Sequence, residues 1–349
     1  MRHCNNIWRV LAVAAILGGL ASLGVSPAAA VVIAGNGSNT PATYPDSSFA
    51  GTSFPGTAVA DFSNVGTNPS DSDSVIYVGN QWVLMAYHSV YFSSDANAAA
   101  GIPSAQTVDF TVNGVTTGYT TDPTTFHQLY CPSAGSGYPS DVVLLKLSPT
   151  TPCALPSLLN SISTTAPTGW MVGLGQGPQN QSTSITYWNS SGGTLAGPSG
   201  AAYSGFTYSS SPRALRWGDA QVSGTAAQVP DGNSRFGVSN GVTDTFYTTF
   251  LNNGNPNEMQ AAPGDSGGGV FSYNTATSSW LLSGMIIGTS NNGGIGNAVT
   301  FGSSTYAADL GAYGGQITTI APEPSTMALL AGGAAAFLAR RLWRARRRR

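Results

Sequence analysis

The sequence predicts an all-β fold, a chain built mainly from short strands joined by turns. Charged residues make up only 8% of the 349 residues, against about 25% in an average globular protein, which disfavours a helix-rich fold or a coiled coil. Glycine is abundant, with 44 residues, and it favours turns because it has no Cβ atom. Short apolar runs bounded by turn residues recur along the chain, and this pattern is typical of strands.

Positive charge is concentrated at the two ends of the chain. Between residues 31 and 321, four basic residues stand against 14 acidic ones. Binding of nucleic acid needs clustered cations that neutralise phosphates. We therefore expect no nucleic-acid partner for the central part of the chain.

Residues 1–30 predict a secretory signal peptide. Two arginines precede an apolar run over residues 10–25, and small residues follow over 26–30. A basic region, an apolar region and a small-residue cleavage site in this order are typical of export signals. Val31 then becomes the first residue of the mature chain. The alternative is an uncleaved membrane anchor, which the short apolar run disfavours.

Residues 321–349 predict a second targeting segment. Pro322-Glu323-Pro324 precedes an apolar run over residues 327–339 and a terminal arginine cluster. As a helix this run would be about 20 Å long, shorter than the hydrocarbon core of about 30 Å. The segment resembles a PEP-CTERM sorting signal, which implies processing by an exosortase and delivery to the surface or exterior of a Gram-negative bacterium. The tail would anchor the chain transiently in the inner membrane, and only the terminal segments would contact lipid.

Between these ends the predicted elements are almost all strands. Residues 34–74 form a loop-like lead-in with little periodicity. An Asn-Gly pair at 113–114 predicts a tight hairpin turn. The predicted strands, which are apolar or alternating runs, cover residues 75–78, 82–86, 107–112, 115–117, 142–147, 169–175, 185–188, 215–217, 246–250 and 280–288.

One helix is predicted, over Tyr306–Ile317. Leu310, Tyr313 and Ile317 follow one another at helical spacing. One of the hydroxyl residues at 303–305 is the expected N-cap.

Two cysteines remain after removal of the signal peptide, Cys131 and Cys153. An even pair in an exported protein predicts a disulfide, which would contribute about 3 kcal/mol in the chain-entropy model. The alternative is two free thiols. No Cys-x-x-Cys motif or Cys/His cluster indicates a metal site, and we expect no cofactor.

A serine within a glycine run, Gly264-Asp265-Ser266-Gly267-Gly268, is the first candidate for chemistry. An acyl-transfer nucleophile needs an exposed hydroxyl beside backbone N–H groups that can hold an oxyanion. The alternative is an ordinary glycine-rich turn, so the interpretation depends on whether the chain supplies a base.

His88 and Asp141 are the candidates for the base and for the group that orients it. His88 follows the apolar run 82–86, and neutral imidazole is the usual base for a serine hydroxyl. Asp141 precedes the apolar run 142–145. Taken singly, His88 could be structural and Asp141 a solvated strand end. His127 lies in a polar stretch and is expected on the surface.

Taken together, these three residues give the chain a family resemblance. They occur in the order His, Asp, Ser, and residues 31–320 resemble a trypsin- or chymotrypsin-like serine protease. The segments that carry the resemblance are Trp82-Val83-Leu84-Met85-Ala86-Tyr87-His88, Ser140-Asp141-Val142-Val143-Leu144-Leu145-Lys146-Leu147 and Gly264-Asp265-Ser266-Gly267-Gly268. The resemblance implies two antiparallel six-stranded β-barrels, over 31–165 and 166–320, with the site between them and a C-terminal helix.

The resemblance also implies a role for each site residue. Ser266 would be the nucleophile, His88 the general base and then acid, and Asp141 the residue that holds the imidazole. The N–H groups of Gly264 and Ser266 would form the oxyanion hole. The implied function is an exported endopeptidase that acts on protein or peptide substrates without a cofactor.

Further positions follow from the same resemblance. Asp265 would pair with an N-terminal amine released at Val31. Gln260 occupies the position of the specificity residue, so cleavage after Lys or Arg is not implied. Tyr87 replaces a small residue beside the base, and the family's substrate-pairing Ser-Trp-Gly has no clean match. These departures sustain an alternative, a catalytically weak or inactive surface-displayed binding or structural protein on the same fold.

Overall fold

A computed structural model of the protein describes residues 31–34, 62–69, 73–90, 103–135, 137–148, 152–178, 181–209, 213–230, 241–290 and 294–322. The predicted signal peptide and the sorting tail from residue 323 onward lie outside these ranges. Among the described residues, no helix is long and apolar enough to cross a membrane.

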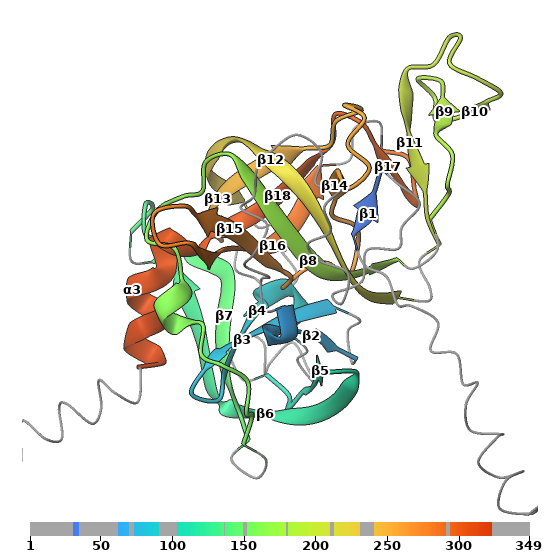
Figure 1. The fold of residues 1–349 in the computed structure, drawn as a ribbon. Coiled ribbons are helices and arrows are strands. Elements are labelled where there is room, and N and C mark those ends of the chain that lie inside the picture. Colours follow the sequence, from blue (N-terminus) through green and yellow to red (C-terminus); the bar gives the residue numbers. More distant parts are fainter. Residues whose placement is uncertain are drawn as a thin grey trace, which may run out of the picture.

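Six antiparallel strands close into the first barrel (Figure 1). Their order around the barrel is β2-β3-β4-β7-β6-β5. Strands β4 and β7 pair from Trp82 opposite Lys146 to Ala86 opposite Val142. The strands are β2 (Val65–Asn68), β3 (Asp73–Gly79), β4 (Trp82–Ala86), β5 (Thr107–Val112), β6 (Val115–Tyr130) and β7 (Pro139–Leu147).

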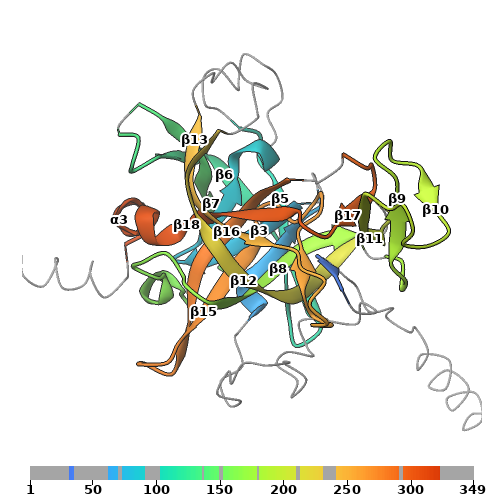
Figure 2. The same ribbon diagram turned by 90° about the horizontal axis from the view of Figure 1, so that it is seen from above.

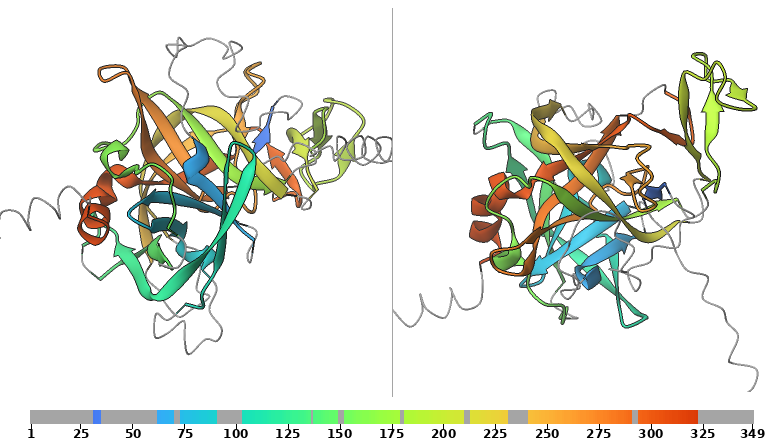
Figure 3. Two further views of the ribbon diagram at one scale, coloured as in Figure 1. Left: turned by 60° about the horizontal axis from the view of Figure 1, so that its bottom comes forward. Right: turned by 45° about the horizontal axis from the view of Figure 1, so that its top comes forward.

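A second sheet of six antiparallel strands also returns on itself as a ring, in the order β12-β13-β18-β16-β15-β8. Figure 3 shows it, mainly yellow to red, lying against the cyan first barrel. The prediction of a mainly β fold is confirmed. The strands are β8 (Trp170–Pro178), β12 (Arg213–Pro230), β13 (Val242–Thr249), β15 (Gly269–Asn274), β16 (Ser279–Ser290) and β18 (Ser304–Asp309).

Short strands form two smaller sheets beside the ring. β1 (Val32–Ile33) pairs with β14 (Met259–Gln260), so the start of the predicted first-barrel segment pairs with a segment from the second half of the chain. The other sheet, on the opposite side of the molecule from the helix α3 in Figure 2, has the order β10-β9-β11-β17. Its strands are β9 (Thr186–Trp188), β10 (Thr194–Leu195), β11 (Tyr203–Thr207) and β17 (Ala298–Thr300).

One apolar core joins the barrel to the ring. Phe62, in the short helix η2 (Phe62–Asn64), packs edge-on against Phe271 of the ring with ring centroids 5.5 Å apart. Val65 and Ile76 of the barrel belong to the same buried cluster. Burial of this apolar surface, at about 25 cal/mol per Å², holds the two halves together and thereby fixes the residues that meet between them.

The C-terminal helix α3 spans Leu310–Ile320, so the predicted start at residue 306 was wrong. The preceding residues belong to β18, which pairs with both β13 and β16. The predicted hydroxyl cap was also wrong, because the Asp309 carboxylate is the N-cap and accepts from the Gly311 N–H. The predicted apolar face is correct, since Leu310, Tyr313 and Ile317 are all buried.

The predicted disulfide is wrong, because Cys131 and Cys153 are both buried free thiols. Their surroundings explain the difference. The Cys131 sulfur lies 3.6 Å from the Ser133 hydroxyl, whereas Cys153 packs in the core of the first barrel with residues such as Tyr77.

Candidate active site

The three predicted site residues come from both halves of the molecule. β4 ends at Ala86, and the short helix η3 (Tyr87–Ser89) then carries His88. Asp141 lies near the start of β7, and Ser266 lies in the loop between β14 and β15. The first barrel thus supplies the imidazole and the carboxylate, and the second half of the chain supplies the hydroxyl.

The structure brings these three side chains together in a hydrogen-bonded row. The Nδ1 atom of His88 lies 2.6 Å from Asp141 Oδ2. Its Nε2 atom lies 2.7 Å from Ser266 Oγ. Both distances fit strong hydrogen bonds. If Nδ1 carries the ring proton, Nε2 is the acceptor for the serine hydroxyl.

Asp141 is held by further contacts that fix the imidazole. Its Oδ1 atom accepts from the backbone N–H of His88 at 3.0 Å, so each carboxylate oxygen bonds the same histidine. The Asp141 N–H in turn donates to the Thr243 hydroxyl on β13 at 2.8 Å. Asp141 is only 3% exposed, and a carboxylate screened from water orients its partner more strongly.

The glycines around Ser266 give the nucleophile loop a shape that few sequences permit. Gly264 has φ +104° and Gly267 has φ +81°, both in the region that favours glycine. Within the described ranges, no backbone carbonyl accepts from the Gly264 N–H or from the Ser266 N–H. Two such donors beside a serine hydroxyl are what an oxyanion hole requires.

Ser74, at the start of β3, is a residue that the sequence analysis missed. Its N–H donates to the Ser266 carbonyl at 2.8 Å, and its hydroxyl donates to the Gly264 carbonyl at 3.2 Å. The same hydroxyl accepts from the Gln176 N–H at 2.6 Å. Ser74 therefore ties the nucleophile loop to the first barrel. No local motif marks it, because its partners are remote in sequence.

Asp265, the loop residue that precedes Ser266, is fully buried. Its Oδ1 accepts from the backbone nitrogen of Val31 at 3.2 Å, and its Oδ2 accepts from the Ala262 N–H at 2.7 Å. Burial raises the pKa of Asp265 to about 7, although these bonds and the charge of Arg213 oppose the rise. The predicted partner atom of Asp265 thus lies within hydrogen-bond distance.

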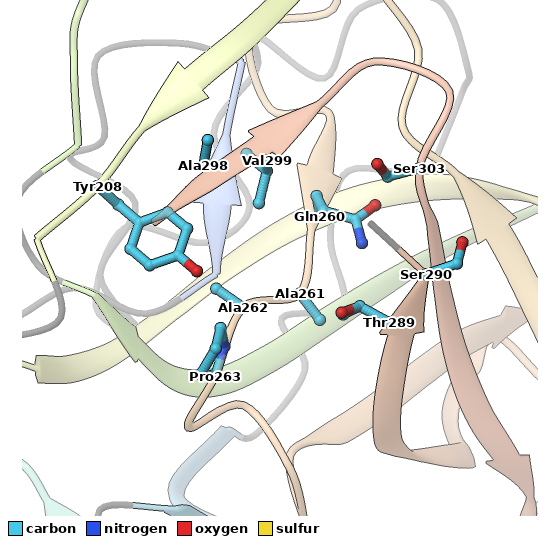
Figure 4. Close-up of a pocket in the computed structure, with 10 residues that line it drawn as sticks. All are labelled: Tyr208, Gln260, Ala261, Ala262, Pro263, Thr289, Ser290, Ala298, Val299 and Ser303. Atoms are coloured by element: carbon cyan, nitrogen blue, oxygen red, sulfur yellow. The ribbon is translucent and has the colours of Figure 1, made fainter. Parts of the chain in front are cut away.

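Gln260 lies in a pocket of about 220 Å³ beside the nucleophile loop (Figure 4). Pro263, three residues before Ser266, also lines it. Three residues span at most about 11 Å, so the pocket lies near the serine. Its lining residues are Tyr208, Gln260, Ala261, Ala262, Pro263, Thr289, Ser290, Ala298, Val299 and Ser303.

Two aromatic contacts place Tyr87, which precedes the base, and His127. Tyr87 is buried, and its ring packs against Phe126 in the core of the first barrel, with centroids 6.3 Å apart. Its bulk is therefore accommodated by the barrel core. His127 lies on β6 with its ring 5.7 Å from that of Trp82. In the part of the chain that the structure describes, no three His, Cys, Asp or Glu residues cluster as metal ligands would.

Comparisons with known proteins give little further information. No family model matches the chain, and no curated protein matches it. Among solved structures, the chain is similar to one described as the Rv3671c protease in an inactive form. The two share 13% identity over 71% of this chain and 83% of that chain, with a TM-score of 0.35. This likeness is too distant to transfer a fold, a residue or an activity.

Proposed function

We propose that the protein is a serine endopeptidase with a chymotrypsin-like arrangement of two barrels. The observation that carries the proposal is the row Asp141–His88–Ser266, with contacts of 2.6 and 2.7 Å. A neutral imidazole held between a buried carboxylate and a serine hydroxyl has the geometry of a general base and its nucleophile.

The reaction follows from these positions. Ser266 Oγ attacks the peptide carbonyl carbon while His88 Nε2 takes the hydroxyl proton, and Asp141 stabilises the imidazolium. The N–H groups of Gly264 and Ser266 stabilise the oxyanion, at about 3 kcal/mol per donor. Collapse breaks the C–N bond, and His88 returns the proton to the leaving amine. Water, activated by His88, then hydrolyses the acyl-enzyme.

We also propose that processing at Val31 supplies an activating charge. The Val31 nitrogen already lies 3.2 Å from Asp265. Cleavage after Ala30 would convert this nitrogen into an ammonium group beside a buried carboxylate. Pairing would favour the ionised carboxylate and lower the pKa of Asp265. The resulting ion pair would hold the loop before Ser266 in place.

Export and tail processing belong to the same proposal. The signal peptide would direct the chain to signal peptidase, and the PEP-CTERM-like tail to an exosortase, with final delivery to the cell surface or exterior. A catalytically inactive binding protein on the same fold is the competing function. The departures from the family pattern in sequence favour it, whereas the intact hydrogen-bonded row opposes it.

A fluorophosphonate probe tests the proposal. We expect protein comprising residues 31–322 to be labelled, and the Ser266→Ala variant to remain unlabelled at equal folding by circular dichroism. Equal or absent labelling in both folded proteins would contradict an activated serine. A version beginning at Ala29 should label at least 10-fold more slowly, and equal rates would contradict activation by the Val31 amine alone.

A further inference from the structure

Tyr313 carries a polar group on the apolar face of the C-terminal helix α3. The residue is fully buried and belongs to the same cluster as Leu310 and Ile317. A purely apolar side chain could fill this place, whereas a buried tyrosine hydroxyl needs hydrogen-bond partners. The partners of the Tyr313 hydroxyl therefore show which strands the helix is tied to.

The first partner lies in the second half of the molecule. The Tyr313 hydroxyl oxygen accepts from the backbone N–H of Asp244 on β13 at 3.1 Å. The Asp244 carboxylate in turn accepts from the Ser133 N–H at 3.0 Å. This part of β13 is thus held both by α3 and by the loop between β6 and β7.

The second partner is Ser140 on β7, in the first barrel, whose side chain is hydrogen-bonded to Tyr313. The Ser140 hydroxyl donates its only hydrogen to the Leu129 carbonyl oxygen at 2.9 Å, because a carbonyl oxygen can only accept. Ser140 Oγ must therefore accept from Tyr313. The phenol thus accepts from β13 and donates to β7.

This bridge requires the phenol to keep its proton. Burial raises the pKa of Tyr313, although the hydrogen bonds with Asp244 and Ser140 oppose the rise. The hydroxyl therefore keeps its proton at the pH values at which an imidazole acts as a base.

The two residues that Tyr313 bridges are neighbours of the residues that hold the site carboxylate. Ser140 directly precedes Asp141, and Asp244 directly follows Thr243. The Asp141 N–H donates to the Thr243 hydroxyl at 2.8 Å. Two links therefore join β7 to β13 at adjacent residues, and each limits the movement that the other would allow.

The helix that presents Tyr313 is itself fixed against the first barrel. Gln316, about one turn after Tyr313, donates to the Tyr130 carbonyl at 2.7 Å and accepts from the Tyr130 N–H at 3.0 Å. Figure 1 shows α3 beside β7. The phenol is thus held in place by an anchored element.

We propose that Tyr313 is a positioning residue for peptide hydrolysis, which acts by holding Asp141 in line with His88. This role rests on the peptidase function, and Tyr313 itself does not contact the substrate. Loss of the hydroxyl would break one of the two links between β7 and β13. Small displacements of a group that acts in the transition state lower the rate strongly, whereas the surfaces that bind the peptide are unchanged.

The test is Tyr313→Phe in protein comprising residues 31–322, assayed with the best substrate from a panel of quenched fluorogenic peptides. We expect kcat to fall by about 10-fold and KM to stay within about 2-fold of wild type, because the lost interaction acts on the transition state. An unchanged kcat, or a rise in KM alone, would overturn the proposal.

Tyr77→Phe is the matched control. Tyr77 is also buried, and its hydroxyl accepts from the Gln81 N–H at 3.3 Å and donates to the Cys153 carbonyl at 3.4 Å. Neither partner lies next in sequence to one of the three site residues. The control should keep kcat within about 2-fold of wild type. An equal fall of kcat in both variants would show a general effect of a lost buried hydroxyl and would overturn the positioning role.

A double variant tests whether Tyr313 acts through Asp141. In the Asp141→Asn background, Tyr313→Phe should lower kcat by less than about 2-fold further, because the carboxylate that it positions is already absent. A general structural defect would lower kcat by the same factor in both backgrounds, and that result would overturn the proposal.

Ser140→Ala serves as a second variant if Tyr313→Phe does not fold, as judged by circular dichroism. It removes the acceptor of the same hydrogen bond, so the same fall of kcat at unchanged KM is expected. Wild-type kcat in folded Ser140→Ala protein would overturn the proposal.

Fluorophosphonate labelling separates this proposal from the peptidase function. Labelling of the wild type together with an unchanged kcat in Tyr313→Phe would overturn the positioning role alone. Absence of labelling in the folded wild type would overturn the peptidase function and, with it, the role of Tyr313.

Discussion

The carboxylate of Asp141 bonds His88 twice, once through the imidazole and once through the backbone N–H. These two bonds fix the orientation of the imidazole ring of His88. A neutral amide in its place would present a donor as well as an acceptor, and the histidine tautomer would no longer be defined.

We therefore expect Asp141→Asn to lower kcat by about 10⁴-fold, as the same change does in the Ser-His-Asp template. Hydrolysis of the best fluorogenic peptide measures the loss. Asp122→Asn, on the exposed side of β6, is the control and should keep full activity. If the Asp141→Asn variant retained more than about a tenth of wild-type kcat, the proposed role of Asp141 would be ruled out.

Asp219 predicts a pH effect on stability. Burial raises the pKa of Asp219 to about 7. The nearby Glu258 also raises it, whereas a hydrogen bond from Asn255 lowers it. The folded chain thus holds a proton that the unfolded chain releases near pH 4. The contribution of Asp219 to the free energy of unfolding is therefore present at low pH and declines as pH rises from about 4 to about 7.

We expect Asp219→Asn to reduce this decline, since asparagine does not titrate and can still accept from Asn255. Urea denaturation of inactive Ser266→Ala protein at pH 5 and pH 8 measures the decline in the free energy of unfolding. The double variant should lose less stability between these values than Ser266→Ala alone. The same loss in both proteins would contradict the raised pKa.

At the scale of elements, the loop between β14 and β15 is shaped by contacts with the first barrel. A Cβ atom on Gly267 would lie 2.1 Å from the Ser74 carbonyl oxygen, and the glycine has φ +81°. A side chain there would conflict with both the backbone conformation and the barrel. The position of Ser266 thus depends on a residue without a side chain.

Gly267→Ala should destabilise the protein by about 1–3 kcal/mol through backbone strain and steric contact. It should also reduce fluorophosphonate labelling at least 10-fold. Gly315→Ala on α3 is the control, because a Cβ there meets nothing within 4 Å. The control should be neutral or stabilising by up to about 1 kcal/mol. Labelling of Gly267→Ala at the wild-type rate would contradict the dependence of the Ser266 position on a glycine at residue 267.

At the scale of the whole molecule, stability comes from the shared core and not from a covalent link. Phe62 and Phe271 join the barrel to the ring, and both described cysteines are free thiols. A reductant should therefore leave the thermal midpoint unchanged within about 1 °C. Scanning calorimetry with and without dithiothreitol measures this. A fall of several degrees would reveal a disulfide and contradict the structure.

The sequence by itself determined the strand-rich class, the hairpin turn and the apolar strands that carry the site. Asn113 and Gly114 adopt φ values of +50° and +78°, as their residue types predict. The buried run after Asp141 and the apolar face of α3 were also predictable. Turn chemistry and hydrophobic periodicity act over a few residues, so they can be read locally. The catalytic roles of His88, Asp141 and Ser266 remain predictions, which their hydrogen-bonded row supports.

Only the tertiary structure decided which distant groups meet. It placed Ser74 beneath the nucleophile loop, put Val31 beside Asp265, and buried the Gln260 oxygen without a partner among the described residues. In it, residues 306–309 of the predicted helix belong to β18, and the two described cysteines are free thiols. These outcomes depend on how the barrel and the ring close and pack together. Contacts across that packing join residues far apart in the chain, and no local pattern encodes them.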